Sequence, residues 1–299
     1  MIDKLKAAGL RIKLFMDGAD VGAMREAYQA RSVSGFTTNP TLMRKAGVTD
    51  YERFAREVIE AIPDLPLSFE VFSDDFPTME REARKIASWG GDTYIKIPIT
   101  NTQRDSAIPL IRTLSGEGFS LNVTAMMNVA QVEAVAEAVS PDARTIFSVF
   151  AGRVADTGVD PVPLMRKAAD AIAGIPKGEL LWASPRELLN LFHAEESGCH
   201  IITATADIIK KLELLGKDLD DYSLETVQMF YRDAVAAGWP KRRLKLSSPI
   251  RGSRSPARRI TASVSSGDGS RQNRISQLPI RSSTGCIRAR NGSIFFASL

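Results

Sequence analysis

The 299-residue sequence contains few of the residues on which disulfide-rich and zinc-binding proteins depend. It has two cysteines, Cys199 and Cys286, and two histidines, His193 and His200. Two scattered cysteines cannot form a disulfide framework, and these four residues lack the spacing of zinc ligands. We therefore expect neither a disulfide scaffold nor a structural zinc site.

Long apolar runs are also missing from the sequence. No stretch approaches the roughly 18 apolar residues that a membrane-spanning helix needs, and residues 1–6 (MIDKLK) lack the apolar core of a signal peptide. The composition, 44% hydrophobic and 25% charged, is typical of a soluble globular protein. We expect a cytoplasmic protein with no membrane partner.

Acidic residues almost disappear towards the C-terminus. Residues 241–299 hold 13 Lys or Arg residues and a single acid, Asp268, a net charge of +12, whereas residues 1–240 carry 26 bases and 34 acids, a net charge of −8. The C-terminal segment is rich in Ser, Arg, Gly and Pro and has no helical or strand period, so it buries too little apolar surface to offset its ordering entropy. We expect one folded domain over residues 1–240 and a disordered, low-complexity tail over residues 241–299. The abrupt change would also fit an out-of-frame or otherwise altered C-terminus.

Residues 1–240 alternate strand-like runs with amphipathic helical stretches, eight of each. The alternation predicts parallel strands in an α/β fold, and eight such units in about 220 residues predict a (β/α)8 TIM barrel. A doubly wound open sheet is the alternative, but no Gly-rich phosphate fingerprint follows an early strand. The expected strands are 13–16, 35–38, 67–72, 93–99, 120–126, 145–150, 180–183 and 200–204, the clearest helices are 51–62, 79–89, 129–139, 163–172 and 185–197, and an additional C-terminal helix covers 224–237.

Lys96 is the single charged residue in the otherwise apolar run 93–99 (TYIKIPI). A buried charge is costly unless it is paired or neutralised. Burial favours the neutral amine of a lysine, and this form attacks a carbonyl carbon to give a Schiff base. The alternative is a lysine on an edge strand that reaches water.

Polar residues also occur at the ends of seven expected strands, where a TIM barrel carries its chemistry. Because alternate strand residues point inward, Lys96 and Glu70 should face the barrel interior. Asn122 and Thr124 share a face and should converge on the same point, although either one alone would fit a structural role. Asp17 alone would fit a helix N-cap, and Arg153 alone a solvated base. The full set is Asp17, Asn39, Glu70, Lys96, Asn122, Thr124, Ser148, Arg153, Ser184 and Arg186.

Six motifs in this order resemble those of the transaldolase family, particularly its short barrel members, over nearly all of residues 12–238. The resemblance implies a class I Schiff-base transfer of a dihydroxyacetone unit between sugar phosphates, without a metal or organic cofactor. The reaction would convert sedoheptulose 7-phosphate and glyceraldehyde 3-phosphate into erythrose 4-phosphate and fructose 6-phosphate, a step of the non-oxidative pentose phosphate pathway. The motifs are FMDGAD (15–20), TTNPT (37–41), IKIP (95–98), LNVT (121–124), SVFAGR (148–153) and ASPR (183–186).

The resemblance also implies a role for each site residue. Lys96 would form the Schiff base, and Glu70 would move protons through a water held with Thr124. Asp17 would take the proton of the substrate hydroxyl when the C3–C4 bond breaks. Asn39, Asn122 and Ser148 would hold substrate hydroxyls, and Arg153, Ser184 and Arg186 the phosphate.

Two positions separate transaldolases from the related fructose 6-phosphate aldolases, which resemble this chain but carry Gln in place of Glu70 and Tyr in place of Phe150. Both positions here match the transaldolases, and Phe150 cannot donate a proton to the enamine. We expect a transaldolase, with aldolase-type activity as the alternative. Gly18 departs from the many relatives that have a hydroxyl residue after the aspartate.

A second class of function is a non-catalytic barrel whose +12 tail binds polyanions such as RNA. The tail offers only Phe295 and Phe296 for stacking on bases, so we do not expect a nucleic-acid partner. We expect sugar phosphates as ligands and, because members of the family assemble, a homo-oligomer.

Overall fold

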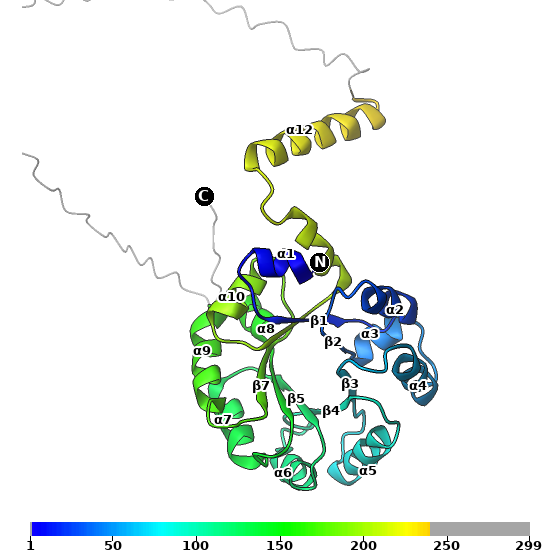
Figure 1. Ribbon diagram of the computed structural model, residues 1–299, viewed down its shortest axis with the longest axis vertical. Helices are drawn as coiled ribbons and strands as arrows, with labels where there is room; N and C mark the ends of the chain where they lie inside the picture. Colours follow the sequence, from blue (N-terminus) through cyan, green and yellow to red (C-terminus); the bar gives the residue numbers. More distant parts are fainter. Residues whose placement is uncertain (1, 240–299) are drawn as a thin grey trace, which may run out of the picture. The chain divides into compact units, whose positions relative to one another are not determined.

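Eight parallel strands form a closed barrel in chain order in the computed structural model, which describes residues 2–239. β8 pairs back to β1, so the barrel closes. Figure 1 shows the strands at the centre of a ring of helices. This architecture confirms the predicted (β/α)8 barrel, while the expected tail over residues 241–299 lies outside the described residues. The strands are β1 (Lys13–Asp17), β2 (Gly35–Thr37), β3 (Leu67–Glu70), β4 (Thr93–Pro98), β5 (Leu121–Met126), β6 (Thr145–Val149), β7 (Gly178–Trp182) and β8 (Ile201–Ala204).

Helices surround the strands, as Figure 1 shows. Many of the helices begin at an Asp or Asn whose side chain accepts a backbone N–H of the first turn. No helix within residues 2–239 is long and apolar enough to cross a membrane. The helices are α1 (Ile2–Ala7), α2 (Val21–Gln29), α3 (Pro40–Lys45), α4 (Tyr51–Ala61), α5 (Phe76–Ala87), α6 (Ile108–Gly116), α7 (Val129–Ala138), α8 (Ala151–Asp156), α9 (Pro161–Ile172), α10 (Asn190–Glu196), α11 (Ala206–Lys210), the 3-10 helix η1 (Lys211–Leu214) and α12 (Leu219–Ala236).

The helix expected over residues 185–197 is wrong in its first turn. Ser184 has a left-handed backbone, with φ of 57°, and Pro185 follows it. The side-chain oxygen of Asn190 accepts the N–H groups of Arg186 and Glu187, at 2.7 and 3.2 Å, so these residues form a loop and α10 begins at Asn190. The C-terminal helix begins earlier than expected, at Leu219, and the short helices α1, α3 and α8 are additional to the one helix expected after each strand.

Side chains inside the barrel form an apolar layer beneath the polar site. Because strand residues alternate between two faces, the residue two positions beyond each member of this layer points in the same direction. The layer therefore supports a ring of side chains at the carboxyl ends of the strands. The pairs of layer and ring residues are Phe15 and Asp17, Tyr94 and Lys96, Ile146 and Ser148, Leu181 and Ala183, and Ile201 and Thr203.

Candidate active site

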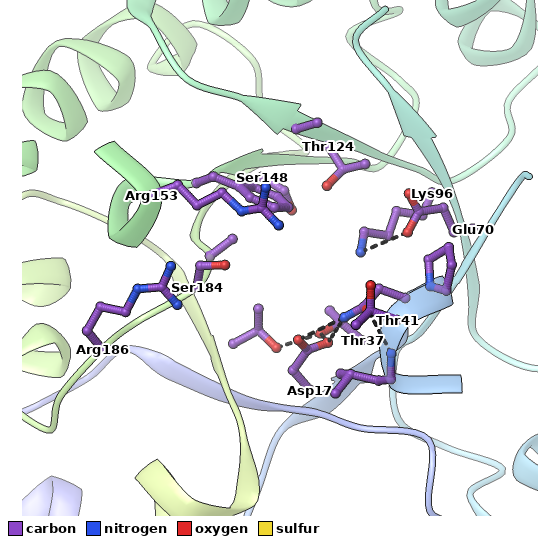
Figure 2. Close-up of a pocket in the computed structure, with 17 residues that line it drawn as sticks. Asp17, Thr37, Thr41, Glu70, Lys96, Thr124, Ser148, Arg153, Ser184 and Arg186 are labelled. Atoms are coloured by element: carbon purple, nitrogen blue, oxygen red, sulfur yellow. Dashed lines mark hydrogen bonds and ion pairs between the residues drawn. The ribbon is translucent and has the colours of Figure 1, made fainter. Parts of the chain in front are cut away.

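A cavity of about 450 Å³ opens at the carboxyl ends of the strands. Every strand, or the residues directly after it, contributes to its wall. Figure 2 shows Lys96 and Glu70 on one side of this cavity, and Arg153, Ser184 and Arg186 on the other. The predicted site residues that line the cavity are Asp17, Asn39, Glu70, Lys96, Thr124, Ser148, Phe150, Arg153, Ser184 and Arg186.

Lys96 is buried in the barrel wall with its amino group beside Glu70. The residue is 6% exposed, and its Nζ lies 3.3 Å from Glu70 Oε2 and donates to the carbonyl oxygen of Thr38 at 3.0 Å. Glu70 and Lys96 are direct partners in the β3–β4 register. A closed barrel has no edge strand, so the alternative of an edge-strand lysine reaching water is wrong.

The backbone of Glu70 is held from outside the barrel. The hydroxyl of Tyr51 donates to the Glu70 carbonyl oxygen at 3.0 Å, and the Tyr51 ring packs edge-on against Phe69 and Trp89. Burial raises the pKa of Tyr51, so its hydroxyl keeps the proton that this hydrogen bond needs. The hydrogen bond from Tyr51 therefore fixes the main chain of Glu70, whose carboxylate lies beside Lys96.

Asp17 faces the cavity from the end of β1 and receives two side-chain hydrogen bonds. Thr37 Oγ1 donates to Asp17 Oδ1 at 2.8 Å, and Asn39 Nδ2 lies 3.2 Å from Asp17 Oδ2. Burial raises the pKa of Asp17, while the charge of Lys96 and the hydrogen bonds from Thr37 and Asn39 act in the opposite direction. Asp17 is not a helix cap, because Asp20 caps α2 through the N–H of Ala23.

Asn122 does not reach the cavity, which differs from the expectation that it holds a substrate hydroxyl. Its Nδ2 donates to Ser68 Oγ at 3.0 Å, and its Oδ1 accepts from Ser148 Oγ at 2.6 Å. The amide is fully buried and is used within the barrel. Thr124, from the same strand, does line the cavity, and its Oγ1 has no hydrogen-bond partner among residues 2–239.

The opposite wall gathers two guanidinium groups and a hydroxyl. Arg186 Nε donates to Asp156 Oδ1 at 3.0 Å, and Nη2 contacts the second oxygen, so the pair is bidentate. Arg186 lowers the pKa of Asp156 and so keeps it charged. The guanidinium of Arg153 lies 5.2 Å from the centre of the Phe150 ring. Such planar donors bind phosphate oxygens at two points.

Gly152 brings the Arg153 and Ser184 segments together. Its N–H donates to the Ala183 carbonyl oxygen at 3.2 Å, and a Cβ atom at this position would lie 1.6 Å from the Ser184 carbonyl oxygen. Only glycine allows this approach of two main chains.

Sequence reasoning missed several residues around the site. Thr37 lies inside the quoted TTNPT motif, and Thr203 is the one polar side chain of β8, so strand parity could have indicated both. Asp156 gave no signal in the sequence, because an exposed acid in a short helix has no pattern that marks its partner.

The site combines a buried amine, two carboxylates and a cationic wall. An amine next to a carboxylate can form an imine with a carbonyl compound, and cationic donors across the cavity can hold an anionic end of the same molecule. Within residues 2–239, no group of three or more His, Cys, Asp or Glu side chains is placed to hold a metal ion.

Residues 14–239 match the model of the family described as transaldolase/fructose-6-phosphate aldolase. The chain belongs to this family. A probable transaldolase 2 of Listeria monocytogenes is 33% identical over 202 residues, which cover 67% of this chain and 88% of that protein. A probable transaldolase of Clostridium acetobutylicum is 32% identical over 225 residues, 75% of this chain and 99% of the relative. The family and these relatives indicate an enzyme of the transaldolase type, consistent with a barrel whose cavity carries an amine and two arginines.

Proposed function

We propose that this transaldolase-family protein moves a dihydroxyacetone unit between sugar phosphates through a Schiff base on Lys96. The proposed reaction converts sedoheptulose 7-phosphate and glyceraldehyde 3-phosphate into erythrose 4-phosphate and fructose 6-phosphate, in the non-oxidative pentose phosphate pathway. The observation that carries the proposal is the buried Lys96 amine, 3.3 Å from Glu70 and across the cavity from Arg153 and Arg186. An extended sugar phosphate would present its ketone to the amine and its phosphate to the arginines.

The first step forms the imine. Lys96 passes a proton to Glu70, and the neutral amine attacks the C2 carbonyl to give a carbinolamine. Glu70 returns the proton to the departing hydroxyl, directly or through a water that Thr124 Oγ1 helps to hold, and water leaves. The unpartnered hydroxyl of Thr124 supports this assignment, because it is free to bind a water or the substrate.

The second step breaks the C3–C4 bond. Asp17 takes the proton of the C4 hydroxyl, the C3–C4 electron pair moves into the iminium, and the products are an aldehyde and an enamine on Lys96. An acceptor aldehyde then enters, the enamine attacks its carbonyl carbon, and Asp17 gives the proton back to the new hydroxyl. Hydrolysis of the new imine then releases fructose 6-phosphate and frees Lys96.

The remaining wall residues bind the substrate. We propose that Arg153, Arg186 and Ser184 hold the phosphate, and that Asn39 and Ser148 hold hydroxyls. Asn122 would act on the substrate only through Ser148, to which it is hydrogen-bonded. We further propose that the enzyme works in the cytoplasm, where soluble sugar phosphates are converted, and as a homo-oligomer.

Phe150 and Glu70 favour transfer over free aldol cleavage. A phenyl ring cannot protonate the enamine, so the enamine persists until an aldehyde arrives. The test measures the dihydroxyacetone that is released from fructose 6-phosphate without an acceptor, and the transfer product formed when erythrose 4-phosphate is added. We expect little release and efficient transfer, both absent in Lys96→Ala. Release without acceptor as fast as transfer would instead support the aldolase alternative.

Phe150→Tyr, with or without Glu70→Gln, should shift the balance towards free cleavage. The added hydroxyl supplies a proton donor beside the cavity, so release of dihydroxyacetone without acceptor should rise relative to transfer. Phe119→Tyr adds the same hydroxyl outside the cavity and should leave the ratio unchanged. Equal ratios in all these variants would contradict the role assigned to Phe150.

A further inference from the structure

Thr203 belongs to a chain of hydroxyl contacts that ends at Asp17. Thr203 Oγ1 lies 2.6 Å from Thr37 Oγ1, and Thr37 Oγ1 lies 2.8 Å from Asp17 Oδ1. The two threonines are 5% and 2% exposed. Their strands, β8 and β2, flank β1, which carries Asp17, so the chain crosses three neighbouring strands.

The number of hydrogens fixes the direction of each contact. Ionised Asp17 can only accept, and Thr37 has a single hydroxyl hydrogen, which it donates to Asp17. Thr37 must therefore accept in its contact with Thr203, and Thr203 must donate. A hydroxyl that accepts a hydrogen bond becomes a better donor, so Thr203 strengthens the bond from Thr37 to Asp17.

We propose that Thr203 is a positioning residue for the carbon–carbon bond-breaking step: by donating to Thr37, it holds the Thr37 hydrogen on Asp17 and keeps Asp17 in the form that accepts the substrate proton. The inference rests on the proposed role of Asp17. It assigns a role in the reaction to a residue of β8, which acts through the side chain of Thr37.

The charged groups around Asp17 determine the sign of the expected pH effect. Lys96 on β4 opposes the burial that raises the pKa of Asp17, as do the hydrogen bonds from Thr37 and Asn39. A weaker bond from Thr37 removes part of this opposition, so the pKa of Asp17 should rise further. The acid limb of the pH profile of kcat/KM should then move to higher pH. The other charged groups on the walls next to Asp17 are Glu70 on β3, Arg153 on α8, Arg186 after β7 and Asp207 on α11.

Thr203→Val removes the hydroxyl and keeps the shape of the side chain. We expect kcat/KM for fructose 6-phosphate in the transfer assay to fall about three- to tenfold, the range for one neutral hydrogen bond, with the loss in kcat and with the acid limb moved to higher pH. Thr203→Ser should restore both values. Thr203→Cys carries a weaker donor, so its kcat/KM and the position of its acid limb should lie between those of the valine and serine variants. This variant still tests the proposal if Thr203→Val folds poorly.

Thr145→Val is the matched control, because Thr145 is also a buried strand threonine, at 1% exposure, and lies outside the cavity. It should keep the wild-type acid limb. The same shift in Thr145→Val would mean that the acid limb reports barrel packing, and it would overturn the assignment.

A double-mutant cycle with Thr37→Val tests whether Thr203 acts through Thr37. In the Thr37→Val background, Thr203→Val should cause no further loss of kcat/KM. An undiminished loss would overturn the proposal, because Thr203 would then act on the substrate or on the fold directly.

Borohydride trapping of fructose 6-phosphate on Lys96 separates the two proposals when the six-carbon and three-carbon labels are summed, because the imine of the intact sugar forms without Asp17. Wild type and Thr203→Val should be labelled alike. Normal labelling together with a wild-type pH profile in Thr203→Val would overturn the role of Thr203 alone. A wild type without label would overturn the proposed function and, with it, this inference.

Discussion

The surroundings of Asp17 act on its pKa in two opposite directions, and the balance affects the stability of the fold. Burial favours its neutral form, whereas the proposed chemistry needs the carboxylate, which Thr37, Asn39 and Lys96 support. A carboxyl whose pKa is raised on folding stabilises the folded state fully only below its unfolded pKa, and that stability is lost as the pH rises through the folded pKa. Ionised Asp17 therefore costs stability at neutral pH.

Asp17→Asn should for this reason be more stable than wild type at pH 7, and the difference in Tm should shrink as the pH falls towards 4, near the ordinary pKa of Asp. Its transfer activity should fall by about 100-fold or more, the usual effect of losing an acid–base group. Thermal unfolding across pH, together with the transfer assay, checks both parts. Asp20→Asn, at the N-cap of α2 where Asn serves equally well, is the control and should change neither quantity. A less stable Asp17→Asn variant at pH 7 would contradict this reading of the site.

The two arginines should distinguish phosphorylated from unphosphorylated substrates. Arg153→Ala and Arg186→Ala should each weaken the binding of phosphorylated sugars by about 1.5 to 3 kcal/mol, the range for hydrogen bonds to charged groups. Binding of unphosphorylated analogues should change far less. Arg166→Ala, which removes an exposed arginine paired with Glu196, serves as the control. Equal losses on both kinds of substrate would mean that Arg153 and Arg186 stabilise the barrel and do not recognise phosphate.

Much of the site could be predicted from the sequence, because strand parity and the polar strand ends are local properties. Lys96, Glu70 and Thr124 reach the cavity as their positions imply. Asn122 does not, because the parity of a strand gives the face of a residue but not whether a neighbour, here Ser148, lies between it and the cavity. Asp156 was missed because its contact with Arg186 depends on how the end of α8 meets the loop after β7 in space.

At the scale of elements, the strand boundaries were predicted closely and the loops were not. Apolar runs of five or six residues identify strands, but the segment after β7 has a helical apolar spacing and still forms a loop. Its course depends on the left-handed backbone of Ser184 and on Asn190, which binds the loop N–H groups. Such tertiary interactions override local helical preference.

The contact of α8 with the loop after β7 predicts the effect of a single methyl group. Gly152→Ala would place a Cβ 1.6 Å from the Ser184 carbonyl oxygen, so one of the two main chains must move. We expect a loss of about 1 to 3 kcal/mol in unfolding free energy, the usual cost of overpacking, and a raised KM for phosphorylated sugars, because Arg153 moves with Gly152. Gly116→Ala, at the end of α6 with open space at the Cβ position, is the control and should be neutral. Unchanged KM and stability in Gly152→Ala would show that the contact between Gly152 and Ser184 does not position Arg153 in the site.

At the scale of the whole molecule, the regular alternation of strand and helix predicted the closed barrel. The exposed side chains of α12 could not be assigned a role in the same way. No residue of this helix is buried, and Leu219, Leu224 and Phe230 are 79%, 56% and 62% exposed. Apolar surface of this extent usually marks a contact with another protein. It is consistent with the expected homo-oligomer, for which light scattering should give a mass that is a multiple of 32.6 kDa; a monomer mass would contradict the expectation.

The most direct measurement of the central claim is borohydride reduction in the presence of fructose 6-phosphate, followed by peptide mapping. Hydride reduces an imine to a stable secondary amine, so a three-carbon fragment should remain on the peptide that contains Lys96. Lys13→Ala, which removes a partly exposed lysine at the start of β1, should still be labelled, and Lys96→Ala should be neither labelled nor active. Label that persists in Lys96→Ala, or that maps to another lysine in the wild type, would contradict the account.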